Sequence, residues 1–108
     1  MLRYLKLVGF VLGFMMSVAA SADAVWIDVR TAAEHLLDSI EGDIRIPHGE
    51  ILEEVQQRYP DRDTEIALYC RGGGRAEMAA EALRQAGYRQ VINAGGIDDA
   101  RRLRNIDE

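Results

Sequence analysis

Residues 66–76 read IALYCRGGGRA, and this stretch predicts a strand, a glycine-rich loop and the start of a helix. Residues 66–69 have apolar side chains on both faces, which is typical of a central strand in a parallel sheet. Three consecutive glycines follow, and glycine allows the positive φ angles that a tight loop needs. Residues 76–86 are strong helix formers, and Gly87 is placed to end that helix. The order places Cys70 at the carboxyl end of a strand.

Short strands and helices alternate along the rest of the chain. We expect further strands at residues 25–29, 44–46 and 91–92 and helices after Thr31, at 50–59 and at 98–108. The helix after Thr31 begins with a Thr-x-x-Glu capping box, and Gly95-Gly96 is expected to turn the chain. The pattern predicts an α/β fold, a small parallel sheet with helices on both faces. A chain of 108 residues has room for one such domain.

The loop after residue 69 surrounds one thiol with positive charge. Curved glycine backbone at Gly72, Gly73 and Gly74 can turn its N–H groups inward, and the following helix adds its own N-terminal N–H groups. Arg71 and Arg75 add two permanent charges. A cysteine in this setting is favoured as thiolate, the nucleophilic form. The residues therefore predict an activated Cys70 in an anion-binding cradle, and the alternative is a surface turn that happens to contain a cysteine.

The amino terminus predicts an export signal. Arg3 and Lys6 precede 14 uncharged residues, 7–20, and two small-x-small cleavage patterns end at residues 22 and 24. The apolar stretch is short for a membrane-spanning helix, which needs about 20 residues. We therefore expect residues 1–22 to be a signal peptide, cut after residue 22 or 24, and residues 23–108 to be a periplasmic domain with no stable membrane insertion.

Composition narrows the possible functions. Removal of residues 1–22 leaves 11 of the 13 basic residues and all 18 acidic ones, so a role in general nucleic-acid binding is disfavoured. Cys70 is the only cysteine, which excludes an internal disulfide. In an exported protein a lone cysteine is buried and inert, joined to a second chain, or a working thiol.

With its loop and flanking motifs, the chain resembles the rhodanese family, specifically the small single-domain periplasmic rhodaneses of the phage-shock type. The loop from Cys70 to Arg75 matches the family's Cys-x-x-x-x-Arg pattern. Residues 26–30 (WIDVR), 42–47 (GDIRIP) and 93–97 (NAGGI) are similar to three further family segments. The resemblance extends over nearly all of residues 25–99.

The resemblance implies a thiosulfate sulfurtransferase. Cys70 would take the outer sulfur of thiosulfate as a persulfide and pass it to cyanide or a thiol, in a two-step covalent scheme. Arg71 and Arg75 would hold the sulfonate end, and the N–H groups of the glycine loop would hold the transferred sulfur. Asp28 and Arg30 would form an ion-paired structural support. The partners would be a small anionic sulfur donor and a thiol or cyanide acceptor, and the scheme needs no metal and no organic cofactor.

Two other functions use a cysteine in a similar loop. A phosphatase or arsenate reductase loop has five residues between Cys and Arg, whereas four separate Cys70 from Arg75. A carrier that holds a persulfide for a protein partner, without turnover of free donor, fits the same residues. His35 and His48 are expected at the surface, outside any metal pattern. Arg101, Arg102 and Arg104 are expected to cap the last helix, with an approach to the loop as the alternative.

Overall fold

The computed structural model describes residues 23–106, so the predicted signal peptide at residues 1–22 lies outside the described residues. The elements in chain order are β1 (Val25–Asp28), α2 (Ala32–Leu37), β2 (Ile44–Arg45), η2 (His48–Glu50), α3 (Ile51–Arg58), β3 (Glu65–Cys70), α4 (Gly74–Gln85), β4 (Gln90–Gly96) and α5 (Ile97–Leu103). The predicted alternation of strands and helices is confirmed.

The four strands form one parallel sheet in the order β2-β1-β3-β4. β1 and β3 are the two central strands, which confirms the central position predicted for residues 66–69. Because all four strands run in the same direction, their carboxyl ends lie at one edge of the sheet. Asp28, Cys70 and Gly96 end β1, β3 and β4, so the sheet brings these three residues to a common edge.

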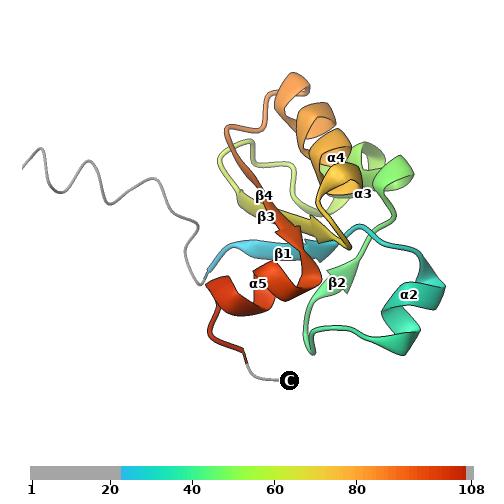
Figure 1. Ribbon diagram of the computed structural model, residues 1–108. Coiled ribbons are helices and arrows are strands. Elements are labelled where there is room, and N and C mark those ends of the chain that lie inside the picture. The colour runs from blue at the N-terminus through green and yellow to red at the C-terminus, as the bar shows by residue number, and fades with distance from the viewer. Residues whose placement is uncertain (1–22, 107–108) are drawn as a thin grey trace, which may run out of the picture.

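Helices cover both faces of the sheet, as predicted. In Figure 1, α3 and α4 lie on one side of the strands and α5 lies on the other. Two hydrophobic clusters correspond to these layers: Ile51, Val55 and Leu83 belong to the first, and Ile97 and Ala100 to the second. The sheet is therefore the middle of three layers, and the loop after β3 passes between its edge and α4.

Local signals in the sequence placed the helix ends well. Thr31 Oγ1 accepts the N–H of Glu34, and the Glu34 carboxylate accepts the N–H of Thr31, which completes the predicted capping box. Gly87 follows α4 with φ +98°, the left-handed conformation expected of a residue that ends a helix. None of the helices within residues 23–106 has the length and apolarity to cross a bilayer.

The end of the chain differs from the prediction. β4 extends over Gln90–Gly96, whereas a strand was predicted only at residues 91–92, and Gly96 pairs with Cys70 instead of forming a turn. Glycine has low strand propensity, and the pairing that overrides it comes from a distant part of the chain. α5 covers Ile97–Leu103, which is shorter than the predicted 98–108. Its first turn is capped by Asp99 Oδ2, which accepts the Gly96 N–H at 2.8 Å.

Candidate active site

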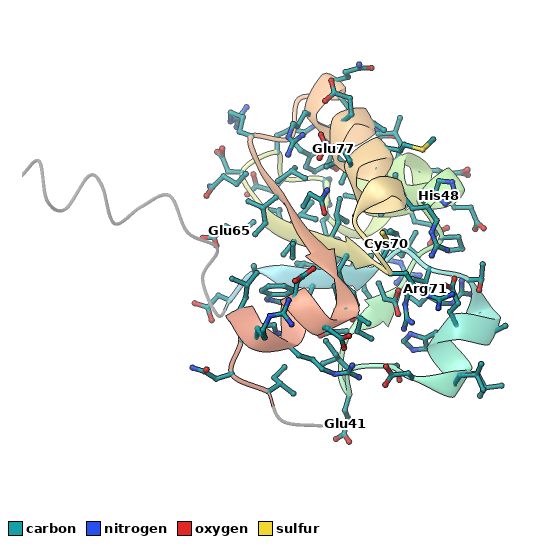
Figure 2. The ribbon with its side chains drawn as sticks, in the orientation of Figure 1. Glu41, His48, Glu65, Cys70, Arg71 and Glu77 are labelled. Atoms are coloured by element: carbon teal, nitrogen blue, oxygen red, sulfur yellow. The ribbon has the colours of Figure 1, made fainter. Side chains whose placement is uncertain are left out.

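Cys70 is the last residue of β3, and its side chain is 1 % exposed. Figure 2 shows it where β3 meets the start of α4, with Arg71 beside it. The loop between strand and helix is short, because α4 already begins at Gly74. Strand, loop and helix therefore form the unit that the sequence predicted, with the thiol at the centre of the turn.

Gly73 brings the backbone to the thiol. Its φ of +103° is in the left-handed region that favours glycine, and its N–H donates to Cys70 Sγ at 2.9 Å. Gly73 is also the N-cap residue of α4, and no side chain caps this helix. The first N–H groups of α4 therefore remain available to an anion held at the loop.

These N–H groups act on the ionisation of the thiol. Burial raises the pKa of Cys70, whereas the backbone N–H groups of Ala76, Gly73, Gly72 and Arg75 lower it, and the net pKa lies below the ordinary value of a thiol. A lower pKa increases the fraction of thiolate at neutral pH, and thiolate is the nucleophile. The geometry therefore supports the activated cysteine inferred from sequence.

The side chain of Arg75 forms an ion pair with Glu34 of the same chain. Its guanidinium makes two bonds to the Glu34 carboxylate, Nη1 to Oε1 at 2.7 Å and Nη2 to Oε2 at 3.0 Å. The hydrogen bond from Arg75 lowers the pKa of Glu34 to about 2, against a smaller opposing effect of burial. The pair ties α2 to the carboxyl end of the loop, so Arg75 holds the loop in place and is not a freely mobile anion-binding group.

Arg71, unlike Arg75, has no side-chain partner among the described residues. It is exposed, and within residues 23–106 its guanidinium makes no hydrogen bond or ion pair. It lines a surface cavity of about 340 Å³ whose other lining residues are Arg30, Glu34, Leu37, Asp38, Ile97 and Asp98. Leu37 is 87 % exposed, and α2 buries none of its side chains. The surface next to Arg71 therefore presents one uncommitted positive charge beside a small apolar surface.

Asp28 and Arg30 form a buried ion pair behind the loop. Asp28 Oδ2 accepts Arg30 Nη2 at 2.8 Å, Asp28 Oδ1 accepts Arg30 Nε at 2.9 Å, and both side chains are almost inaccessible. His35 Nδ1 lies 2.9 Å from Asp28 Oδ2. Burial raises the pKa of Asp28, but the contacts with Arg30 and His35 outweigh it, and the pKa lies below its usual range.

Close backbone contact between β4 and the loop explains the glycine at position 96. A Cβ on Gly96 would lie 2.1 Å from the carbonyl oxygen of Arg71, so no larger residue fits without a backbone shift. Asn93, three residues earlier, donates from Nδ2 to the Gly73 carbonyl oxygen at 3.0 Å. Asn93 was not predicted as part of the site, although it belongs to the NAGGI segment at residues 93–97.

The structure also places the two histidines and the arginines near the carboxyl terminus. His35 and His48 are both partly exposed, but the surface placement predicted for His35 omitted its contact with Asp28. The three arginines near the carboxyl terminus all pair with acidic side chains, and two of these acids, Asp38 and Asp98, line the cavity beside Arg71. Arg101 binds Asp38 and Asp98, and Arg102 binds Asp99. Arg104, just after α5, binds Asp43 and lies over the ring of Trp26.

Residues 17–102 match the family model of the rhodanese-like domain. Thiosulfate sulfurtransferase PspE of Escherichia coli K12 is 34% identical over 88 residues, which cover 82% of this chain and 85% of that protein. The tRNA uridine(34) hydroxylase of Enterobacter sp. 638 is also 34% identical over 88 residues, but only 25% of its length is covered. A solved structure of an E. coli rhodanese with anions has a TM-score of 0.65 and 36% identity, and the match covers 68% of this chain and 87% of that one.

Proposed function

Because the chain belongs to the rhodanese family, we propose that this sulfurtransferase moves the outer sulfur of thiosulfate to cyanide or a thiol through a persulfide on Cys70. One observation supports the proposal above all: Cys70 Sγ accepts the Gly73 N–H at 2.9 Å at the start of α4. Such a site stabilises a thiolate before reaction and a negatively charged sulfur after it. The name of the E. coli relative supports thiosulfate as the donor.

The reaction has two steps. The Cys70 thiolate attacks the outer sulfur of thiosulfate, the sulfur–sulfur bond of thiosulfate breaks, and sulfite leaves with the bonding electron pair. Cyanide or a thiolate then attacks the terminal sulfur of the persulfide, and the Cys70 thiolate is regenerated. No oxidant, metal or organic cofactor enters this scheme. Sulfite leaves before the acceptor reacts, and the enzyme alternates between a thiolate form and a persulfide form, which gives ping-pong kinetics.

We assign the loop residues different tasks in this scheme. The N–H groups of Gly72, Gly73 and Gly74 hold the transferred sulfur, and Arg71 attracts the sulfonate end because its charge is uncommitted. Arg75 contributes its charge from a fixed place, since Glu34 holds it. The Asp28–Arg30 pair supports the end of β1 next to β3 and takes no part in the chemistry.

Thiocyanate formation from thiosulfate and cyanide tests the proposal. We expect the wild type to turn over with parallel double-reciprocal lines, and Arg71→Ala to raise the KM for thiosulfate roughly tenfold, because a charge-assisted contact is lost. Arg89→Ala is the matched control: Arg89 is an exposed arginine paired with Asp63, and its loss should leave KM unchanged. An unchanged KM in Arg71→Ala would remove Arg71 from the donor site.

The same assay separates the enzyme from a carrier. A carrier would accept sulfur on Cys70 but would release it only to a protein partner, so free cyanide would produce no repeated turnover. Cys70 is almost fully buried, and a small donor such as thiosulfate can reach a recessed thiol more readily than a bulky one. Sulfur loading without thiocyanate formation would favour the carrier.

We also propose that the protein acts in the periplasm after loss of residues 1–22 or 1–24. The support is the order of charged, apolar and small residues at the amino terminus. Expression of the full chain in a bacterium, followed by amino-terminal sequencing of the periplasmic fraction, is expected to give a protein that begins at Asp23 or Val25. Recovery of the intact amino terminus would contradict export with cleavage.

A further inference from the structure

Asn93 links β4 to the loop that holds Cys70. Its Nδ2 donates to the Gly73 carbonyl oxygen at 3.0 Å and reaches Glu77 Oε1 at 3.3 Å. Its Oδ1 accepts the Gly95 N–H at 2.9 Å. The acceptor at Gly73 and the donor at Gly95 together fix which way the amide faces. Asn93 therefore connects the N-terminus of α4 with the end of β4 through one side chain.

A β-bulge places Asn93 for this contact. Leu68 of β3 pairs with Asn93 of β4, and Cys70 pairs with Gly96, so β4 has one residue more than β3 between the two pairs. Bulges of this kind redirect side chains and occur next to active sites. The extra residue also permits Gly95 to take a φ of +91°. β4 thus departs from regular geometry at the point where it meets the loop.

Gly73 makes hydrogen bonds on both sides of its backbone. Its N–H points at Cys70 Sγ, and its carbonyl oxygen accepts both the Asn93 amide and the Glu77 N–H, the latter at 2.9 Å. Glycine has no Cβ to restrict its backbone, and no side chain caps α4 at this position. The direction of the Gly73 N–H is therefore maintained by hydrogen bonds to the other side of the residue.

We propose that Asn93 is a positioning residue for Cys70, whose amide fixes Gly73 so that the Gly73 N–H points at the sulfur. Asn93 does not contact the sulfur and acts only through Gly73. The proposed effect on the Cys70 thiol rests only on the hydrogen bonds of Asn93 and Gly73. The effect on catalysis rests on the sulfurtransferase function proposed above.

Alkylation of Cys70 by iodoacetamide as a function of pH tests the proposal without any sulfur donor. Because Cys70 is the only cysteine, the reaction reports this thiolate alone. We expect the pKa of Cys70 in Asn93→Ala to rise by about half a unit to one unit, since one of several N–H contacts is misdirected while the others remain. Asn93→Asp, which keeps the acceptor for Gly95 but loses the donor to Gly73, should raise it at least as much.

A control variant on the same strand and the unchanged charged groups around Cys70 make this measurement specific. Gln90→Ala is the matched control, because Gln90 lies on the same strand and its amide donates to the Asp63 carbonyl oxygen at 3.0 Å, at the far end from Cys70. This control should leave the pKa of Cys70 unchanged. All three variants keep the charged and titratable groups of the surrounding elements, and Asn93→Asp adds one carboxylate to them. These groups are Arg71, Arg75, Glu77, Glu34, Asp28, Arg30, His35, His48 and Asp99.

Thermal unfolding and persulfide formation complete the test. A lower melting temperature in both Asn93 variants with an unchanged pKa of Cys70 would show that Asn93 has only a structural role and would overturn the proposal. A raised pKa together with a matching shift in the pH profile of sulfur loading is the expected result. If the pKa rises but the wild type takes no sulfur from thiosulfate, the positioning role stands and the proposed function fails.

Discussion

Cys70→Ser is expected to gain no mass from thiosulfate, whereas the wild-type protein gains about 32 Da, one sulfur atom, that cyanide removes. Serine has nearly the shape of cysteine and can still accept the Gly73 N–H, so the loop should keep its structure. Its hydroxyl is not ionised at neutral pH, and an alcohol cannot hold sulfur as a persulfide. Turnover should therefore fall below about one thousandth of the wild-type rate. Intact-protein mass spectrometry before and after cyanide measures both steps.

The result can be interpreted directly because the chain has a single cysteine. Circular dichroism and thermal unfolding of Cys70→Ser provide the control, since a folded variant without mass gain locates the sulfur on Cys70. An equal mass gain in the variant would mean that sulfur binds elsewhere, and the persulfide mechanism would be wrong. If the wild type gains nothing while its thiol is free and reductant is absent, thiosulfate is not the donor.

The part of the site that is local in sequence could be predicted. The strand, the glycine loop and the helix of residues 66–85 are consecutive, so propensity and glycine geometry were sufficient to place Cys70 at a helix N-terminus. The same holds for the Thr31 capping box. These features depend on residues at most a few positions apart, and the structure confirms them.

Contacts between distant residues could not be predicted in this way. The two loop arginines are alike in sequence, but Arg75 binds Glu34, 41 residues earlier, and Arg71 binds no side chain within residues 23–106. The Gly95-Gly96 pair was interpreted as a turn because its strand pairing depends on β3. The position of α2, which carries Glu34, is what distinguishes the paired Arg75 from the unpaired Arg71.

Asp28→Asn is expected to lower the free energy of unfolding by about 3–5 kcal/mol, because it leaves Arg30 buried without an opposite charge. Asp28 is fully buried and receives the backbone N–H and the guanidinium of Arg30 together with His35. An asparagine of the same size fills the space but presents a donor where an acceptor is needed. For a domain of this size the melting temperature should fall by roughly 4–8 °C for each kcal/mol.

Asp63→Asn is the matched control for Asp28→Asn. The Asp63–Arg89 pair has the same charges and an N–O distance of 2.7 Å, but both side chains are exposed, so its removal should have little effect on stability. Urea unfolding compares the three proteins, and a small loss in Asp28→Asn would contradict a structural role for the buried pair. A second variant, Asp28→Ala combined with Arg30→Met, removes both charges and should recover part of the stability.

The pH dependence of the stability difference gives an independent test of the same pair. The pKa of Asp28 is lowered in the folded protein, so its contribution is present above the unfolded pKa of about 3.9 and is lost as the pH falls through the folded value. The difference between wild type and Asp28→Asn should shrink below about pH 4. Glu34, whose pKa is about 2, titrates in both proteins, so its effect cancels in the difference. A difference that does not shrink between pH 4 and pH 2 would mean that the charge of Asp28 does not stabilise the fold.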